Sequence, residues 1–363
     1  MDIIKKLGLI LLTPLFVILL FATALDIGFV RSATHPATVK RLVAESGIYS
    51  SVVPSLLQKP QIITTQYGNI STSDPEIKQV ANSVLSPIFI QQNAEMAIDN
   101  TYDWLDGKIA EPNFKIDLNG TKTLFANRIA DVAQKRLSKL PRCTLAQSRA
   151  IAQSGQYDAF NATCLPVGVS PTSVAEQIKT SLVNQKEFLK ETNISPADIK
   201  NGNNNQSVFN DQLKDAPKQY QHLKKTPLIL SLLTILTGVG IVFLSSTWLK
   251  GLKHAGIILL VVGLLMLVFA WGLNKGVSSQ VVTKIKIDNA QMQKDVRLLI
   301  IDITQLVDKN YWVFGGLYTI LGGAGIATAI IMNRNRDAVL LTSKESTPED
   351  KGASDEPKRA KKD

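Results

Sequence analysis

The stretch that decides the fold covers residues 227–273 and reads PLILSLLTILTGVGIVFLSSTWLKGLKHAGIILLVVGLLMLVFAWGL. Two apolar segments within it, residues 227–249 and 255–273, contain no charged side chain. At a rise of about 1.5 Å per residue, each segment is long enough to cross a hydrocarbon layer of about 30 Å as a helix. Only residues 250–254 separate the two segments, which predicts a tight turn at one face of the membrane. The stretch therefore predicts a transmembrane helical hairpin.

Two further apolar segments, residues 7–30 and 313–332, are also long enough to span a membrane. The first has an alternative interpretation as a signal peptide, because Lys5 and Lys6 precede it and Ala22-Thr-Ala24 resembles a cleavage site. We favour an uncleaved anchor, since the apolar run continues beyond that motif. Either interpretation exports the segment that follows.

The basic residues beside the apolar segments predict the orientation of the chain. They lie before the first segment, in the hairpin turn and after the last segment, so they share one side only if both termini are cytoplasmic. We expect a multi-pass plasma membrane protein with residues 1–6, 250–254 and 333–363 in the cytoplasm. Residues 31–226 and 274–312 are then extracytoplasmic. The basic residues are Lys5, Lys6, Lys250, Lys253, Arg334 and Arg336.

The composition indicates which partners to expect. The chain has 363 residues, of which 45% are hydrophobic, and a formal net charge of +10. A positive charge of this size is compatible with nucleic-acid binding, but the basic residues do not form one patch. We therefore expect contact with the lipid bilayer and with a membrane or envelope protein, and no nucleic acid.

The exported residues 31–226 carry mostly helical signals, so the expected fold class is mainly α: a polytopic membrane protein with a largely helical extracytoplasmic domain. Pro36, Pro75 and the pair Ser86-Pro87 are typical helix starts. Apolar spacing predicts three later helices, and residues 114–118 alternate as expected of a strand. The later helices are residues 121–140, 171–191 and 209–225.

The segment 274–312 must leave and re-enter the membrane at the same face. We expect a helix that continues the third span, a bend near Asp288-Asn289, and a returning helix that docks on the exported domain. Its apolar seam has a four-three spacing that suits packing against another helix. The charged tail, residues 333–363, is expected to be disordered. The seam consists of Met292, Val296, Leu299, Ile303 and Leu306.

Cys143 and Cys164 are the only two cysteines, and both lie in the exported region. A cysteine pair in an oxidising compartment predicts a disulfide. A metal site lacks a nearby histidine, and a redox site lacks the Cys-x-x-Cys spacing. We expect a structural bridge that stabilises the domain by about 3 kcal/mol in the chain-entropy model.

Four acidic residues, Glu95, Asp99, Asp103 and Asp106, fall on one face of a predicted helix. Like charges at this spacing destabilise a helix, so a compensating partner is expected. One interpretation is a site for a divalent cation, although helical carboxylates seldom bind calcium without loop ligands. A second is pairing with basic side chains, and a third is a solvated face. The candidate basic partners are Arg128, Lys135, Lys139 and Arg142.

The fourth span carries small residues at every fourth position, a spacing that lets helix backbones approach closely. We expect helix packing at Gly315, Thr319, Gly323 and Ala327. The second, third and fourth spans contain no internal ionisable residue, which argues against a pump or a proton-coupled carrier. No phosphate-binding loop, zinc-protease motif or nucleophile elbow occurs in the chain. We therefore expect no catalytic residue and no cofactor.

Four short motifs resemble a family of uncharacterised bacterial membrane proteins with four spans and a two-cysteine exported helical domain. They are Trp104-Leu-Asp-Gly107, Phe114-Lys-Ile-Asp-Leu118, Leu140-Pro-Arg-Cys143-Thr and Cys164-Leu-Pro166. The resemblance covers the middle of the exported domain. It implies a bacterial cell-envelope protein and carries over no activity.

The leading hypothesis is a non-enzymatic envelope protein whose exported domain binds or senses a partner. The first alternative is a small channel or transport accessory subunit built around the glycine-rich fourth span. The second alternative is an extracytoplasmic hydrolase that uses exported carboxylates. The sequence favours the first hypothesis mainly because no catalytic motif supports the others.

Overall fold

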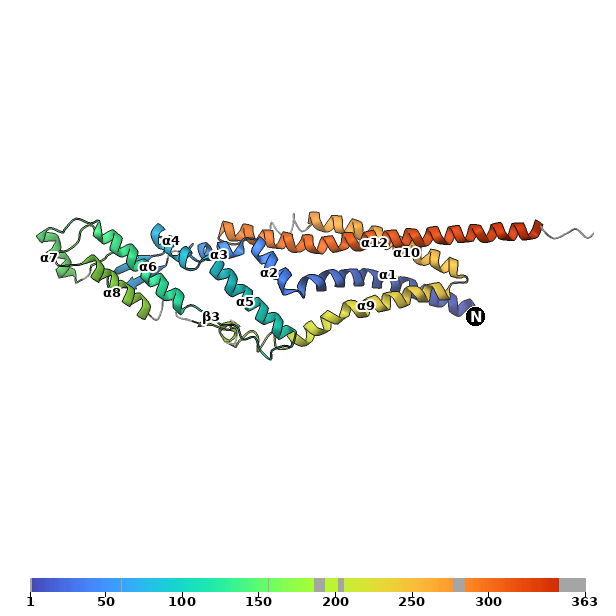
Figure 1. Ribbon diagram of the computed structural model, residues 1–363, viewed down its shortest axis with the longest axis horizontal. Helices are drawn as coiled ribbons and strands as arrows, with labels where there is room; N and C mark the ends of the chain where they lie inside the picture. Colours follow the sequence, from blue (N-terminus) through green and yellow to red (C-terminus); the bar gives the residue numbers. More distant parts are fainter. Residues whose placement is uncertain are drawn as a thin grey trace, which may run out of the picture. The chain divides into compact units, whose positions relative to one another are not determined.

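The computed structural model describes residues 2–59, 61–155, 157–185, 193–201, 206–276 and 285–345. The described residues are mainly helical, and four of their helices are long and apolar enough to span a membrane (Figure 1). This confirms the fold class predicted from the sequence. The chain forms two compact units. The membrane unit contains Met1–Ala24, Leu230–Phe269 and Tyr311–Asp363, and the domain unit contains Leu25–Ile229 and Ala270–Asn310.

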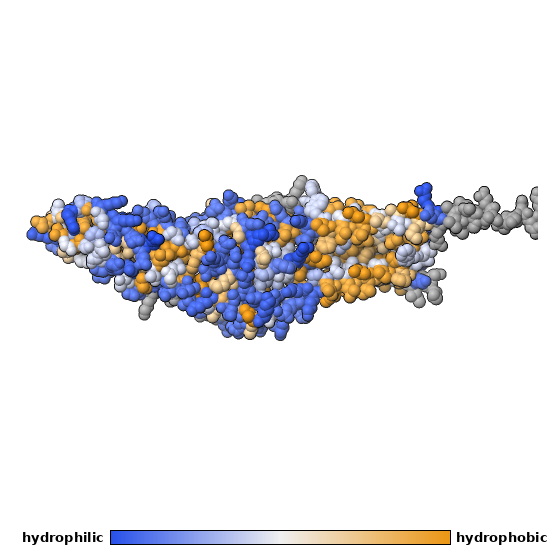
Figure 2. Space-filling view, viewed as in Figure 1, coloured by the Kyte–Doolittle hydropathy of each residue, from blue (hydrophilic) through white to orange (hydrophobic). Residues whose placement is uncertain are grey.

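The four long helices are α1 (Asp2–Ala33), α9 (Ala216–Leu244), α10 (Trp248–Gly276) and α12 (Ala290–Glu345). Figure 2 shows a continuous hydrophobic surface over part of these helices, whereas the surface of the other elements is mixed and mainly hydrophilic. Apolar side chains such as Leu228, Phe243 and Ile320 stay more than two-thirds exposed, which in water would be unfavourable. Lipid is the solvent that such a surface requires.

The hairpin turn lies earlier than the sequence predicts. Residues 245–247 connect α9 to α10, whereas residues 250–254 already belong to the first turns of α10. The side chain of Thr247 accepts a hydrogen bond from the backbone N–H of Lys250 (3.4 Å). Ser and Thr compete with helical hydrogen bonding and favour helix starts, so the Ser-Ser-Thr sequence makes a better turn than the following Lys-Gly-Leu-Lys-His.

The helix predicted over residues 209–225 is wrong as a separate element. Residues 207–215 form bridges and turns, and α9 begins at Ala216 and continues through Pro227 into the second span. Pro227 lacks the N–H that would bond the Leu223 carbonyl. Thr226 Oγ1 donates to that carbonyl instead (2.8 Å). The Leu223 carbonyl therefore keeps a hydrogen-bond donor, and the helix continues through the proline.

The expectation of a disordered tail from residue 333 is wrong for its first part, because α12 extends to Glu345. The sequence from Arg334 to Lys344 contains no glycine or proline and is rich in helix-forming residues, so nothing ends the helix at the end of the span. Residues 346–363 lie outside the described residues. The helix predicted to continue the third span is α10 up to Gly276, and residues 277–284 also lie outside them.

The domain unit contains seven shorter helices, one 3-10 turn and two small antiparallel sheets among its described residues. Its helices are α2 (Pro36–Glu45), α3 (Ile48–Leu56), α4 (Pro75–Val84), α5 (Pro87–Leu105), α6 (Asn119–Ser138), α7 (Leu145–Ser154) and α8 (Pro171–Asn184). Its strands pair as β1 (Ile62–Thr65) with β2 (Gly68–Ser71), and β3 (Ile116–Asp117) with β4 (Asn193–Ile194).

Local sequence signals explain several of these elements. Asp74 accepts hydrogen bonds from the backbone at the start of α4, and Ser86 does the same for α5 through the N–H of Phe89 (3.2 Å). The helix starts predicted at Pro75 and at Ser86-Pro87 are therefore confirmed. The predicted strand 114–118 is present as the shorter β3. The helix start predicted at Pro36 is also confirmed, and Gly47, whose φ of 84° is not helical, separates α2 from α3.

The main core of the domain unit forms where α6 packs against α8 and α4. Its central side chains are fully buried, and the β1–β2 hairpin covers one side with Ile63 and Ile70. A second layer brings α2 and α3 against α5. The first part of α12 docks on α3, where Ser51 Oγ donates to Met292 Sδ (3.3 Å). The large core side chains with at most 1% exposed surface are Ile70, Ile77, Ile129, Leu137, Ile178 and Leu182.

Candidate functional site

The predicted acidic stripe lies on α5, and its carboxylates have partners. Lys40 of α2 donates to Asp99 at 2.8 Å, and Gln91 donates to Glu95 at 2.8 Å. The ion pair between Lys40 and Asp99 therefore belongs to the contact between α2 and α5.

The lower half of the stripe is neutralised by two further lysines. Lys108 Nζ lies 2.7 Å from Asp103, and Lys224 Nζ lies 2.7 Å from Asp106. The hydrogen bond with Asp103 raises the pKa of Lys108. Pairing with lysines explains how the like charges are tolerated on one helix face.

The basic partners expected from the sequence are wrong. None of Arg128, Lys135, Lys139 and Arg142 forms an ion pair with the stripe in the described part of the chain. Arg142 instead donates to the backbone carbonyls of Pro166 and Val169 (3.4 and 3.3 Å). The true partners come from α2, α9 and the turn after α5, and not from α6 or the segment that follows it. Within the described ranges no group of three His, Cys, Asp or Glu side chains is placed to hold a metal ion.

The predicted disulfide between Cys143 and Cys164 is present, with a Cα–Cα distance of 4.9 Å. Both cysteines are buried. The bridge joins the segment after α6 to the segment before α8, where Cys143 N donates to Leu165 O at 2.9 Å. It therefore fixes the connection between the two helices that form the main core.

Half of the predicted packing stripe on α12 lies at a helix contact. A β-carbon built at Gly315 would lie 3.1 Å from the Gly263 carbonyl oxygen of α10, and one built at Gly263 would lie 2.6 Å from Thr319 N. A β-carbon at Gly323 would meet nothing within 4 Å among the described residues, and Ala327 is exposed. Gly323 and Ala327 therefore lie outside the α10–α12 contact, and helix packing at these two positions stays a prediction.

The contact between α10 and α12 continues at Gly322 rather than at Gly323. A β-carbon at Gly322 would lie 2.5 Å from Leu260 N, and one at Gly256 would lie 3.0 Å from the Gly322 carbonyl oxygen. A spacing of four residues drifts by about 40° per step around a helix, so a constant spacing leaves the contact face. Steps of four and three residues, as from Gly315 to Thr319 to Gly322, stay on it.

The membrane unit has its own buried cluster, which all four long helices share. Phe16, Leu20 and Ala24 of α1 pack with residues of the other three helices, including Ile241 and Tyr318. Outside this cluster the four helices expose apolar side chains over most of their length. The chain is a multi-span membrane protein.

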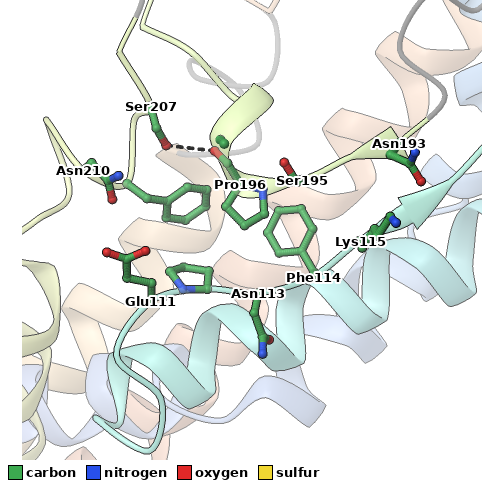
Figure 3. A pocket seen from close by; sticks show the side chains of 12 residues that line it. Glu111, Asn113, Phe114, Lys115, Asn193, Ser195, Pro196, Ser207 and Asn210 are labelled. Atoms are coloured by element: carbon green, nitrogen blue, oxygen red, sulfur yellow. Dashed lines mark hydrogen bonds between the residues drawn. The ribbon is translucent and has the colours of Figure 1, made fainter.

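A cavity of about 540 Å³ lies in the domain unit beside the β3–β4 sheet (Figure 3). Its apolar lining is contributed by Pro112 and Phe114 before β3, Pro196 after β4, and Phe209. The ring of Phe209 packs edge-on against Phe114, with 6.3 Å between the ring centroids, and against Trp104 at 5.7 Å. This aromatic cluster holds together three segments that are distant in the sequence.

Polar side chains surround this apolar centre. Ser195 and Ser207 are bound internally, to Asp198 (2.6 Å) and to the Pro196 carbonyl (2.8 Å), respectively. The side chains that make no hydrogen bond or ion pair within the described residues are those available to a ligand. They are Glu111, Asn113, Lys115 and Asn210.

Sequence reasoning missed this cavity. Only the side formed by residues 112–118 carried a local signal, as a predicted strand after Pro112. The opposite side comes from residues 193–197 and 207–210, which belong to a polar part of the sequence without periodicity. No pattern in that segment indicates that Phe209 reaches Phe114.

Comparisons of the chain with protein-family models, with curated proteins and with solved structures found no match. The function is therefore inferred from the contacts and cavities of the molecule itself.

Proposed function

We propose that this chain is a cell-envelope protein of the plasma membrane whose exported domain unit binds a protein partner through the β3–β4 cavity. The observation that carries this proposal is the cavity itself. It has an apolar centre, and the side-chain amides of Asn113 and Asn210 beside it make no hydrogen bond within the described residues. An apolar side chain of the partner enters between Phe114, Pro196 and Phe209. Asn113 and Asn210 pair with the partner's backbone, because a side-chain amide offers the same donor and acceptor groups as a peptide bond.

The proposed orientation places both termini in the cytoplasm and the domain unit outside. Basic residues at the membrane ends support it through the positive-inside rule. The disulfide supports it independently, because such bonds persist in oxidising compartments. The resemblance to bacterial four-span membrane proteins agrees with this arrangement.

The proposal retains α1 as an uncleaved anchor. The segment that resembles a cleavage site is buried in the membrane unit, where Ala24 has no exposed surface. Thr23 Oγ1 lies 2.8 Å from Thr234 Oγ1 of α9. A β-carbon built at Gly238 of α9 would lie only 3.1 Å from the ring of Phe16, so α1 and α9 pack closely there. Removal of α1 would expose this face of α9.

The test is site-specific photo-crosslinking in native membranes. A crosslinking residue at Asn210, on the cavity, is compared with one at Leu145 of α7, which is exposed but outside the cavity. We expect an envelope protein to be captured from position 210 and not from position 145. The substitution Asn113→Lys on the same cavity should abolish capture, because it places a charge and a long side chain beside the apolar centre.

The remaining outcomes separate the alternatives. Equal capture from both positions, or capture that persists in Asn113→Lys, would contradict the proposed site. Ion flux through liposomes that is lost in Gly323→Leu would favour a channel. Polymer cleavage that is lost in Asp103→Asn would favour a hydrolase, although Asp103 is paired with Lys108.

A further inference from the structure

A second cavity, of about 600 Å³, lies in the membrane unit where α1 begins and where α9 turns into α10. Its polar lining consists of Lys5, Lys6, Ser245, Ser246, Lys250 and His254. These residues come from both sides of the hairpin turn and from the start of α1, so the cavity exists only when the three helices are packed together. None of the residues that line the β3–β4 cavity lies here.

The charge of this cavity is of one sign. Three lysines line it, and none of its described lining residues is acidic. Among the side chains that the structure describes, which in α1 begin at Lys5, no carboxylate lies within 4.0 Å of Lys5, Lys6 or Lys250. Lysine ammonium groups and a serine hydroxyl are hydrogen-bond donors, and their convergence at one place suits an oxyanion such as a phosphate. Ser245 donates to the Ile241 carbonyl at 2.9 Å, which leaves Ser246 as the hydroxyl that faces a ligand.

The walls of the cavity are apolar. Leu9 of α1 and Leu244 of α9 line it, and the helices approach closely there because a β-carbon at Gly8 would lie 2.5 Å from Leu244 Cδ2. The neighbouring side chains Leu7 and Phe243 are 59% and 75% exposed, so the outer surface beside the cavity faces lipid. A cavity that is lined by both basic donors and apolar side chains fits a ligand that carries both a phosphate and an acyl region.

His254 lines the cavity and contacts α1. Its Nε2 lies 3.3 Å from Thr13 Oγ1 of α1, which ties the start of α10 to α1. The position of the cavity, at the ends of apolar helices, matches the headgroup level of a bilayer. Basic pockets between transmembrane helices on the cytoplasmic side are a known mode of recognition of anionic headgroups.

We propose that this cavity binds the phosphate of an anionic phospholipid from the leaflet at which the amino terminus lies. The lysines bind the phosphate oxygens, Ser246 donates a further hydrogen bond, and Leu9 and Leu244 contact the first carbons of the acyl chains. A free phosphate ion would use the same donors but would leave the apolar walls without a partner. The lipid therefore accounts for the whole lining.

The experiment uses the full chain in detergent micelles that contain equal amounts of phosphatidylglycerol and phosphatidylcholine. Native mass spectrometry counts the lipids of each kind that the protein retains. We expect selective retention of phosphatidylglycerol. Lys250→Gln should weaken its binding about fivefold, equivalent to about 1 kcal/mol for one lysine near a headgroup. The triple change of Lys5, Lys6 and Lys250 to Gln should remove the selectivity.

Lys253→Gln is the matched control. Lys253 is exposed and lies three residues from Lys250 on the same helix, but it does not line the cavity. Its substitution by glutamine removes the same charge as Lys250→Gln. It should leave selectivity unchanged. An equal loss in both variants would mean that the lipid follows net charge alone, and it would overturn the site. Unfolding temperatures in phosphatidylcholine, which we expect to be equal, verify that each variant folds.

A second measurement separates the two sources of phosphate. The unfolding temperature of the wild-type chain in phosphatidylcholine micelles is compared with and without inorganic phosphate at constant ionic strength, and with and without phosphatidylglycerol. Stabilisation by the lipid and not by the ion supports the proposal. Stabilisation by the ion without selectivity for the lipid, or by neither, overturns it.

Discussion

The main core of the domain unit and the α10–α12 contact of the membrane unit are both tightly packed, but they use opposite kinds of residue. The core of α4, α6 and α8 is filled by large aliphatic side chains such as Leu137 and Ile178, neither of which has exposed surface. The α10–α12 contact is made by glycines whose backbones touch. In water, burial of a large apolar side chain drives folding. In lipid the same side chain gains little, so helices associate through close backbone packing.

The largest expected effect tests the core side of this comparison. Leu137→Ala removes a fully buried side chain of α6 and should destabilise the domain unit by about 2–5 kcal/mol. Leu124→Ala, on the same helix but 44% exposed, should cost only about 0.5 kcal/mol. Pulse proteolysis of the full chain in urea, in mild detergent, measures both. Similar losses at the two positions would show that burial does not determine stability here.

The second effect tests the membrane side. Gly322→Leu places a side chain where backbone atoms of Leu260 and Gly256 lie, so α10 and α12 must separate. We expect a loss of about 1–3 kcal/mol, typical of overpacking. Gly323→Leu adds the same side chain where nothing lies within 4 Å of a β-carbon in the described chain, and it should be tolerated. Thermal unfolding in detergent compares the two neighbours, and equal loss would contradict the assigned contact face.

A third, smaller effect concerns an ion pair in the domain unit. Arg136 of α6 donates to both carboxylate oxygens of Asp74 (2.7 and 2.8 Å), and Asp74 also caps α4. The side-chain hydrogen bond from Arg136 is the main cause that holds the pKa of Asp74 below its usual value of 3.8. This stabilisation is complete above that value and is lost as the pH falls towards the lower pKa of the folded state.

Asp74→Asn should therefore cost about 1–2 kcal/mol at pH 7, from the cap and the charged hydrogen bonds together. It should also flatten the decline in stability below about pH 4. Urea midpoints measured from pH 7 down to pH 3 verify both effects. Asp131→Asn, an exposed position on α6, serves as the control and should leave the pH profile unchanged. A profile that stays steep in Asp74→Asn would assign the acid sensitivity to other carboxyls.

The smallest expected effect is the hydrogen bond between Thr23 and Thr234 in the membrane unit. Thr→Val at each position keeps the shape and removes the hydroxyl, and the double-mutant cycle isolates the pair. We expect a coupling energy of about 0.6 kcal/mol, the average of such bonds between membrane helices. Unfolding in detergent gives the four stabilities of the cycle. A coupling well above 2 kcal/mol would mean that polar contacts, rather than glycine packing, dominate this unit.

The sequence predicted those features that depend on local chemistry. Asp74-Pro75 and Ser86-Pro87 specify helix starts through a cap and a fixed φ, and both starts were correct. The β1–β2 hairpin was missed because its strands are four residues long and stabilise each other only by pairing. Its β-branched run from Ile62 to Thr65 was the signal that would have indicated it.

The candidate sites depended on contacts that no local pattern encodes. The cysteine pair was predictable, because a chain with two cysteines allows only one pairing. The lysines that pair with the acidic stripe come from α2, α9 and the turn after α5, so the nearest basic helix in the sequence was the wrong choice. The cavity beside β3 and β4 forms where Phe209 packs against Phe114. These two residues are distant in the sequence and come together only in the folded chain.

The spacing of the glycines in the α10–α12 contact has a mechanical consequence. Gly256 and Gly263 of α10 are seven residues apart, as are Gly315 and Gly322 of α12. Gly256 therefore lies opposite Gly322 while Gly263 lies opposite Gly315. A slide of α10 along α12 by less than about 10.5 Å takes these glycines out of register and brings larger side chains towards the backbone of the facing helix. The matched spacing therefore opposes a piston movement of one of these helices along the other.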